Sequence, residues 1–568
     1  MKRRDFLKFG VAAAASLAGS RVEASNLAKP AGTASTGFCF ANRSTLDLSA
    51  KPSPPSTPFV APLKRPVIKQ AGPQRLDPPP EPKAHQRYNQ FVPRKFYEVH
   101  EQEFKWQYHP EPPYDKGSWS WGFDGTTPGP SFYIRCGEPV LVRIFNDLPA
   151  IGRSNLRFAL PSTSTHLHGA HLASESGGYP TDFIDPGEFW DHHYPNFPMG
   201  HDKRGELTTL WYHDRRLDFA EANLLAGLAG FYLLFDDEDS GNENDPNPLA
   251  FRLPSGKYDL PLLLQDMKFD ETGQIAFAAP NSGGMLGDKY SVNRILQPYC
   301  TVEARKYRLR ILNAGPSRFY QLFLASARRQ DVTHAFAVIT EDGNFLPAPI
   351  QAESIYLAVG QRTEVVVDFS RFKAGEQLFL QNRLEQTSVQ GPNGKVLEMG
   401  DTIMRFDVVE NKAPDHSRVP EQFRKVPDVI TTNVNHQRIW KFDDQDGQST
   451  INGKIFDPKR SDAKIRNGSE EIWSLLNTSR TRSYALQFDL AEFLLLEVNG
   501  RPIVKNSMLA DRQKPLSVFV RGRRCDAIAL LPNDHVKLYA KFRDFRGKYL
   551  MQCLNADHQR VAVRWDVL

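Results

Sequence analysis

One pattern recurs three times along the chain and constrains its fold more than any other feature. A turn leads into a strand of buried character that ends in asparagine, at Asn146, Asn313 and Asn477. The spacing is roughly 165 residues, the size of one ordinary domain. Around these strands, short runs rich in Val, Ile, Phe, Tyr and Leu alternate with Gly, Pro, Asn and Asp, which is typical of strands and tight turns. The pattern predicts an all-β protein of three consecutive β-sandwiches.

The predicted domains occupy most of the 568 residues. We place them at residues 96–245, 246–420 and 421–568, because a single core rarely grows beyond roughly 250 to 300 residues. Helical periodicity is scarce, and residues 219–228 are the best candidate for a helical turn or two. Residues 50–82 are crowded with proline. We therefore expect residues 25–95 to form an extended arm or linker.

The N-terminus predicts export. Residues 2–8, Lys-Arg-Arg-Asp-Phe-Leu-Lys, precede an apolar stretch of small residues that reaches Gly19. This resembles a twin-arginine signal peptide, which we assign to residues 1–24, with the mature chain beginning near Ser25. The apolar stretch is too short to cross a bilayer core of about 30 Å, and no later stretch reaches that length. We expect a periplasmic protein whose mature chain has no membrane span.

Charge and cysteine content limit the function classes. The net charge is only +5, and no run of Lys and Arg is interleaved with aromatic residues, which argues against a nucleic acid partner. The five cysteines are too few and too scattered for a disulfide framework. One pair could bridge in an oxidising compartment, but the sequence does not identify which.

Several phrases match those of a known family, in that family's order. They are residues 125–130 (Gly-Thr-Thr-Pro-Gly-Pro), 165–169 (Thr-His-Leu-His-Gly), 210–215 (Leu-Trp-Tyr-His-Asp-Arg), 226–230 and 306–314. On these residues the chain resembles the multicopper oxidases. Its proline-rich stretch also resembles the long N-terminal arm of their bilirubin oxidase and spore-coat laccase group. The match covers nearly the whole mature chain. The resemblance implies three cupredoxin-like Greek-key β-sandwich domains.

The resemblance also implies a set of copper positions that this sequence fills only in part. The family oxidises substrates at a type 1 copper and reduces dioxygen to water at a trinuclear cluster held by eight histidines; imidazole and thiolate are the ligands that suit copper. Here the type 1 positions correspond to Arg482, Cys553 and His558, with Val563 at the axial place. The cluster positions retain His166, His168 and His213, and the other five are Arg215, Ala485, Gln487, Gln552 and Leu554.

The replacements suggest a local hypothesis. In the family the positions of Arg215, Gln487 and Gln552 serve the same type 3 copper. We predict that the Arg215 guanidinium replaces that cation and that the amide oxygens of both glutamines accept its hydrogen bonds. Cys553 is predicted to be a small buried apolar residue. Arg482 is expected to form a surface salt bridge rather than to bind an anion.

Other histidines lie near the first two motifs in sequence. We interpret all of them as solvated loop residues without a role: His171, His192, His193 and His201.

The sequence supports two functions from different classes. The first is a periplasmic binding or scaffold protein without laccase activity or cofactor, whose partner is a periplasmic protein or a small ligand. The alternative is a metal-dependent oxidoreductase with a residual copper site, at partial occupancy, on His166, His168 and His213. A standard oxidase needs six histidines in the last domain, and residues 426–568 contain only three. Whether the chain is an enzyme, or has acquired a new activity in the old substrate pocket, stays open at this point.

Overall fold

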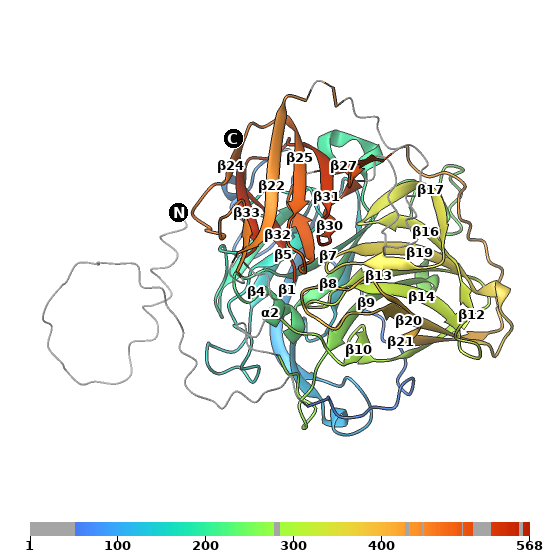
Figure 1. Ribbon diagram of the computed structural model, residues 1–568. Helices are drawn as coiled ribbons and strands as arrows, with labels where there is room; N and C mark the ends of the chain where they lie inside the picture. Colours follow the sequence, from blue (N-terminus) through green and yellow to red (C-terminus); the bar gives the residue numbers. More distant parts are fainter. Residues whose placement is uncertain are drawn as a thin grey trace, which may run out of the picture. The chain divides into compact units, whose positions relative to one another are not determined.

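The computed structural model describes residues 51–277, 284–425, 431–432, 434–445, 448–490, 492–503, 524–555 and 560–568. Within them, strands form six sheets that follow one another in pairs along the chain (Figure 1). We call strands β1 to β8 the first domain, β9 to β21 the second and β22 to β33 the third. This confirms the predicted all-β architecture of three sandwiches. The predicted signal peptide and Cys39 lie outside the described residues.

The first domain pairs two four-stranded sheets around one core. Its elements are η1 Pro82–Ala84, β1 Lys95–Trp106, η2 Tyr114–Lys116, β2 Ser118–Phe123, β3 Gly129–Arg135, β4 Val140–Asn146, β5 Thr165–His168, β6 Phe189–Tyr194, η3 Met199–His201, η4 Lys203–Gly205, β7 Thr209–Asp214, α2 Ala220–Ala226 and β8 Ala229–Phe235. The sheet orders are β2-β1-β4-β6 and β3-β8-β7-β5. Helix α2 lies inside the predicted helical segment and is followed by the capping residue Gly227, whose φ of 135° favours glycine.

The second domain packs a seven-stranded sheet against a six-stranded one. Its elements are η5 Gly256–Tyr258, β9 Asp259–Met267, β10 Lys289–Val292, β11 Ile295–Leu296, β12 Tyr299–Glu303, β13 Lys306–Asn313, β14 Tyr320–Ser326, β15 Thr333–His334, β16 Phe336–Glu341, β17 Asn344–Ala352, β18 Ile355–Leu357, β19 Arg362–Asp368, η6 Phe369–Arg371, β20 Gln377–Leu384 and β21 Val396–Val409. The sheet orders are β11-β10-β9-β13-β19-β16-β17 and β12-β21-β20-β14-β15, with β18 beside β14.

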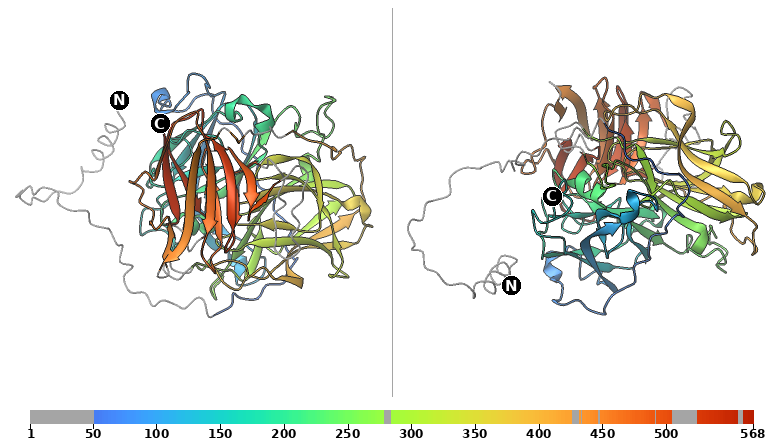
Figure 2. Two further views of the ribbon diagram at one scale, coloured as in Figure 1. Left: turned by 45° about the horizontal axis from the view of Figure 1, so that its top comes forward. Right: turned by 90° about the horizontal axis from the view of Figure 1, so that it is seen from below.

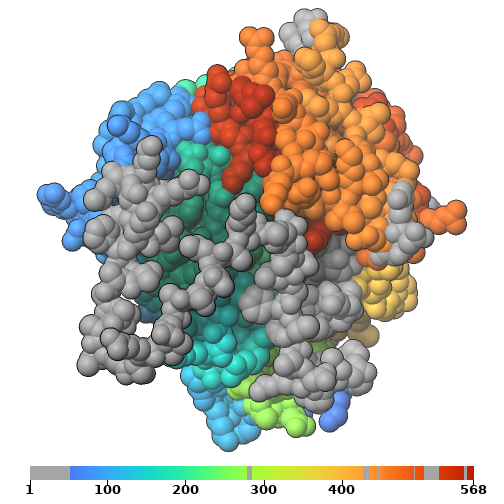
Figure 3. Space-filling model, turned by 90° about the vertical axis from the view of Figure 1, so that its left-hand side faces the viewer, coloured from blue at the N-terminus to red at the C-terminus, as the bar shows by residue number. Residues whose placement is uncertain are grey.

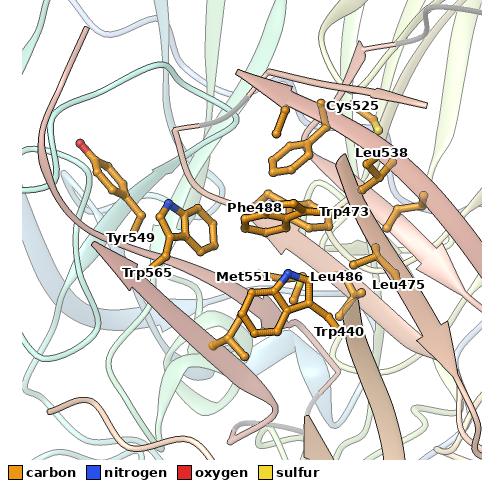
Figure 4. Close-up of a cluster of buried hydrophobic side chains, with 14 of the residues drawn as sticks. Trp440, Trp473, Leu475, Leu486, Phe488, Cys525, Leu538, Tyr549, Met551 and Trp565 are labelled. Atoms are coloured by element: carbon orange, nitrogen blue, oxygen red, sulfur yellow. The ribbon is translucent and has the colours of Figure 1, made fainter. Parts of the chain in front are cut away.

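The third domain has the same plan, and its strands appear in orange and red in Figure 2. They are β22 His436–Gln445, β23 Gln448–Ile451, β24 Ala463–Ile465, β25 Glu470–Asn477, β26 Tyr484–Phe488, β27 Glu492–Val498, β28 Arg501–Pro502, β29 Arg524–Cys525, β30 Ala527–Leu530, β31 His535–Lys541, β32 Gly547–Cys553 and β33 Ala562–Val567. Aromatic rings pack among aliphatic side chains in its core (Figure 4). There the Trp473 and Trp565 rings meet edge to face, with centroids 5.2 Å apart.

The repeated asparagines explain why the three domains share one plan. Each ends a strand that runs parallel to an earlier one: β4 beside β1, β13 beside β9 and β25 beside β22. The side-chain oxygen of Asn146, Asn313 or Asn477 accepts the N–H two residues later. Its amide nitrogen donates to carbonyls of two neighbouring segments. The asparagine thus satisfies backbone groups where the strand leaves the sheet.

A buried charged network joins the first and second domains. We call it the Glu364 network, and its members are Thr208, Thr209, Asp239, Asp259, Arg308, Arg310 and Glu364. Arg308 donates to Glu364 at 2.6 Å and to both oxygens of Asp239 at 2.9 and 2.8 Å. Among the buried side-chain polar atoms of the described chain, none from this network lacks a hydrogen-bond partner.

The proline-rich segment lies along the first two domains. The backbone pairs with strands at Pro62, beside Tyr299, and at Ile68, beside Ser131. Near its start, the Ser53 N–H donates to Asp288 at 2.7 Å. Over its described part, the segment therefore behaves as an arm rather than as a free linker. In the described parts of the chain, no helix combines the length and apolar character that crossing a bilayer requires.

Candidate functional site

Two adjacent strands of the first domain bring three histidines to one face. His166 and His168 are two residues apart on β5, so they share a side of the strand. His213 on β7 is the direct cross-strand partner of His166. All three side chains are buried, and one ring nitrogen from each lies within 4.8 Å of the others. We call this group the histidine site.

Burial keeps the three imidazoles neutral. It lowers the pKa of His168 to about 4, and it lowers the pKa of His166 and His213 well below the usual histidine value. The guanidinium of Arg215 lowers the pKa of His166 further. The indole of Trp211 stacks on His213 with ring centroids 4.0 Å apart. At neutral pH the site therefore offers uncharged imidazole nitrogens, the form that binds metals.

The three histidines differ in how many of their nitrogens are engaged. His166 donates from Nδ1 to the Gly177 carbonyl at 2.5 Å, and its Nε2 contacts the Gln487 side-chain amide. His213 donates from Nδ1 to the Asp214 carbonyl at 2.8 Å. Within the described chain, Nε2 of His213 and both ring nitrogens of His168 have no hydrogen-bond partner. The donor set can hold one metal ion, provided that Gln487 moves away from His166.

Arg215 has a different partner from the predicted one. Its Nη1 donates to both carboxylate oxygens of Asp489, at 2.9 and 3.1 Å, and lies 3.2 Å from Nδ1 of His166. The Gln487 side-chain oxygen accepts no hydrogen bond from any described residue. Nε and Nη2 of Arg215 have no partner among the described residues, so the predicted bonds from Arg215 to Gln487 and Gln552 are both wrong. A carboxylate balances a buried guanidinium better than an amide does, because it carries the opposite charge.

The third domain places the replaced positions opposite the histidines. Strands β26 and β32 pair so that Gln487 faces Gln552. Next to this pair, the Leu554 N–H donates to the Ala485 carbonyl at 2.8 Å. Ala485 and Leu554 belong to an apolar cluster shared with the second domain. A Cβ added at Gly360 would lie 3.2 Å from the His168 ring and would also strike the Leu554 side chain, so Leu554 packs beside His168.

The other predicted ligand positions lie farther into the third domain. Arg482 donates to Asp444 at 2.6 Å, and its side chain is only 15% exposed, so this salt bridge is partly buried rather than at the surface. Cys553 and Val563 are buried in the third-domain core, as predicted for Cys553. His558 lies outside the described residues. None of Cys136, Cys300, Cys525 and Cys553 forms a disulfide with another of these four.

The prediction that the neighbouring histidines are solvated is wrong at three of the four positions, His171, His192 and His193. His192 and His193 lie on β6 with 2% exposure each, and they contact the Ser176 and Phe91 carbonyls at 2.9 and 2.7 Å. They are buried because each imidazole has a backbone acceptor. His171 also has buried contacts, since its ring lies 3.0 Å from a carboxylate oxygen of Asp544. His201 is exposed, as predicted.

Sequence reasoning missed two acidic residues beside the site. Asp489 lies two residues after Gln487 and neutralises Arg215. Asp526 precedes β30, accepts two hydrogen bonds from Arg362 at 2.7 and 2.6 Å, and lies 3.4 Å from Nε2 of His168. Arg362 holds the pKa of Asp526 well below its usual range, although burial opposes this. Arg215 and Arg362 were the signal that could have indicated them, because a guanidinium that is buried requires an acidic partner.

First-domain and third-domain surfaces meet around this region, as the teal and red residues of Figure 3 show. Across the boundary, Lys548 forms an ion pair with Asp182 at 2.6 Å. The histidine site therefore lies where two domains contribute side chains.

Comparison with known proteins identifies relatives. Two family models described as multicopper oxidase match residues 106–239 and 268–395. Bilirubin oxidase from Albifimbria verrucaria is 30% identical over 82% of this chain and 74% of its own length. Cell division protein FtsP from Edwardsiella tarda is 30% identical over 71% of this chain and 77% of its own length.

A solved structure provides a comparison of the fold. The crystal structure of laccase from Pediococcus acidilactici superimposes with a TM-score of 0.70 at 20% identity, over 92% of this chain and 96% of that one. This likeness confirms the predicted cupredoxin-like fold.

Proposed function

The chain belongs to the multicopper oxidase family, and on this premise we propose that it is an exported member without laccase activity. It acts in the periplasm by binding a partner protein or a small ligand. The observation that carries the proposal is the Arg215–Asp489 ion pair beside His166. The guanidinium lies 3.2 Å from a ring nitrogen of His166 and has no lone pair to offer a metal, and both oxygens of Asp489 are already hydrogen-bonded to it.

The third-domain side supports the same conclusion. The Gln487 side-chain amide contacts Nε2 of His166, the ring nitrogen that would otherwise face a metal. The adjoining positions carry Ala485, Gln552 and Leu554, and none of these side chains can replace imidazole as a copper ligand. The residues present therefore do not fit a trinuclear copper cluster.

The position of electron entry is also altered. Where the family resemblance implies a histidine ligand, Arg482 forms an ion pair with Asp444 at 2.6 Å. A guanidinium stays protonated and has no lone pair to offer a metal. A blue copper that accepts electrons from a substrate is therefore not expected.

A relative supports the binding role. FtsP is named for cell division rather than for an oxidation, and it is 30% identical to this chain. The family scaffold therefore serves roles beyond oxidation. The analogy favours a binding function without identifying the same partner.

Metal and activity measurements test the proposal together. The full chain is folded with copper present, dialysed, and analysed for bound metal, for blue absorption and for oxidation of a phenolic substrate. We expect no blue band and no oxidation above that of free copper. Near-stoichiometric blue copper with oxygen consumption would overturn the proposal.

A second candidate function rests on a specific observation. His168 and His213 carry buried ring nitrogens without partners among the described residues, and together with His166 they can hold one metal ion. This favours a metal-dependent oxidoreductase with a residual copper site. One colourless metal per chain, lost in a His168→Gln/His213→Gln double variant and kept in the exposed control His436→Gln, would support it.

Export is part of the proposal and has its own test. An Arg3→Lys/Arg4→Lys double variant should stay in the cytoplasm, because the motif of residues 2–8 resembles a twin-arginine signal. Cell fractionation followed by immunoblotting measures this. Periplasmic recovery of the variant at the wild-type level would contradict the assignment.

A further inference from the structure

His171 joins the first domain to the third through both nitrogens of its ring. Its side chain is only 6% exposed. Nδ1 lies 3.1 Å from the Leu490 carbonyl oxygen, and Nε2 lies 3.0 Å from a carboxylate oxygen of Asp544. Leu490 follows β26 and Asp544 follows β31, so one imidazole bridges two segments of the third domain. We call these three residues the His171 contact.

The two acceptors determine the protonation state of the ring. A carbonyl oxygen and a carboxylate oxygen can only accept hydrogen bonds, and an imidazole donates from both nitrogens only when it is protonated. Burial tends to raise the pKa of Asp544, but hydrogen bonds from His171 and the Gly200 N–H, together with the Arg87 charge, hold it well below its usual value. Asp544 is therefore ionised, and the geometry is that of a buried imidazolium paired with a carboxylate.

The Asp544 carboxylate also holds the N-terminal arm. One oxygen accepts the Gly200 N–H at 2.9 Å, and the other lies 3.2 Å from Nη1 of Arg87. The Arg87 guanidinium in turn lies 4.9 Å from the ring centres of Phe91 and Phe197. The arm, the first domain and the third domain thus meet at one carboxylate.

Other charged groups lie around the His171 contact. Arg543 directly precedes Asp544 in sequence, and the His201 ring lies 3.4 Å from Nη2 of Arg87. His171 also lines a cavity of about 70 Å³, whose other titratable lining residues are Cys136, Glu206, Arg524, Cys525 and Asp526. The neighbouring cations oppose a charge on the ring, but Coulomb interactions weaken with distance, so the two acceptors in direct contact with His171 favour the imidazolium.

We propose that the His171 contact is a pH-sensitive switch that fastens the first domain to the third while His171 is protonated and loosens when the ring loses its proton. A neutral ring donates from only one nitrogen, so the Leu490 carbonyl or the Asp544 carboxylate then faces a nitrogen lone pair. Because β5 ends at His168, three residues before His171, the change occurs beside the histidine site. The switch needs no metal, so it does not depend on the proposed lack of copper.

NMR of the metal-free full chain with ring-labelled histidine measures the proton directly. The signal is assigned with His171→Asn, because asparagine removes the ring. We expect wild-type His171 to carry a proton on both nitrogens at pH 7 and to lose one at higher pH. Asp544→Asn should lower the pH at which the ring titrates by about 1 to 3 units. A neutral ring at pH 7, or the same titration in both proteins, would overturn the proposal.

Urea unfolding at pH 5.5 and pH 9 tests whether the proton stabilises the fold. A group that holds its proton more tightly in the folded state contributes stability at low pH and loses it as the pH rises. The unfolding constant of His171→Asn, divided by that of wild type, should therefore be above one at pH 5.5 and fall about tenfold by pH 9.

His192→Asn is the matched control. His192 is buried in the same domain and contacts the Ser176 carbonyl at 2.9 Å, but burial lowers its pKa to about 4. Folding below pH 6.5 therefore removes a proton from His192, and the same ratio should rise with pH in this variant, opposite to His171→Asn. A ratio for His171→Asn that stays constant, or rises as in the control, would show a purely structural imidazole and would overturn the proposal.

Discussion

Two groups of buried polar side chains in this molecule show opposite patterns. In the Glu364 network, between the first and second domains, every buried polar atom has a partner among the described residues. At the histidine site and Arg215, near the third domain, ring and guanidinium nitrogens are left without one. Both groups contain buried arginines and carboxylates. The difference lies in whether the side chains alone satisfy one another.

Buried polar groups that satisfy one another have a structural role, whereas buried polar groups without partners are more stable when a ligand binds them. A fully satisfied buried network contributes to specificity and needs no ligand, whereas each unsatisfied buried group costs about 1 to 3 kcal/mol. At the histidine site, a metal ion bound to the three imidazoles would engage these nitrogens. The comparison therefore predicts that ligands affect one group and not the other.

The largest effect is expected from breaking the Glu364 network. Glu364→Ala removes the carboxylate that Arg308 and Thr209 share, so buried donors lose their acceptor. We expect the free energy of unfolding to fall by about 3 to 5 kcal/mol. Urea unfolding at neutral pH measures it. The exposed control Glu398→Ala should change it by less than about 0.5 kcal/mol, and an equally small effect of Glu364→Ala would contradict the prediction.

A smaller loss is expected at the Arg215 side. Asp489→Ala removes the carboxylate that Arg215 contacts, but the space it leaves beside the adjoining small cavity can admit a water molecule. We expect a loss of about 2 to 3 kcal/mol, because the guanidinium is not left entirely without an acceptor.

Urea unfolding at neutral pH compares the two variants directly. Asp489→Ala should lose less stability than Glu364→Ala, because the Glu364 carboxylate has more buried donors to satisfy than Asp489 has. Equal losses in the two variants would mean that the contrast between the two regions does not hold.

The features that local pattern and strand geometry determine could be predicted from the sequence. The asparagine-ended strands at Asn146, Asn313 and Asn477 indicated three domains, because the same backbone groups need satisfying at each strand end. The alternation of His166 and His168 placed both on one face of β5.

The partner of Arg215 could not be read from the sequence. Gln487 and Asp489 both lie on or beside β26, and which of them meets Arg215 depends on how two domains pack together. No local pattern encodes that packing. The burial of His192 and His193 was missed for a related reason, since their backbone acceptors, Ser176 and Phe91, lie 16 and 102 residues earlier in the sequence, outside β6.

Two buried glutamates, Glu364 and Glu101, differ in pKa and therefore in how they make stability depend on pH. Arg308 and Arg310 help to lower the pKa of Glu364 to about 2, although burial opposes this. Glu101 has Thr163 and Thr165 as side-chain partners, and burial raises its pKa from 4.5 to about 8. Glu364 is thus charged across the neutral range, whereas Glu101 is protonated up to about pH 8 in the folded state.

Glu101 should therefore make the protein less stable as pH rises. Unfolding releases its proton at any pH between 4.5 and 8, so the free energy of unfolding falls across that window by at most about 1.4 kcal/mol per pH unit. Glu364 titrates below this window in both states and adds no slope there. Other buried acids, such as Asp214 with a pKa raised to about 7, add slope of the same sign.

Glu101→Gln isolates the contribution of this one group. Glutamine keeps a neutral side chain of the same size near Thr163 and Thr165 but cannot release a proton. The free energy of unfolding of the variant, relative to wild type, should therefore rise from pH 5 to pH 8, and the rise includes the interaction of Glu101 with Asp214, whose charge helps to raise the pKa of Glu101. Urea unfolding at several pH values measures it, with the exposed Glu398→Gln as control. Parallel pH profiles of Glu101→Gln and wild type would show that Glu101 is ionised in the folded protein and that a cation or water compensates it.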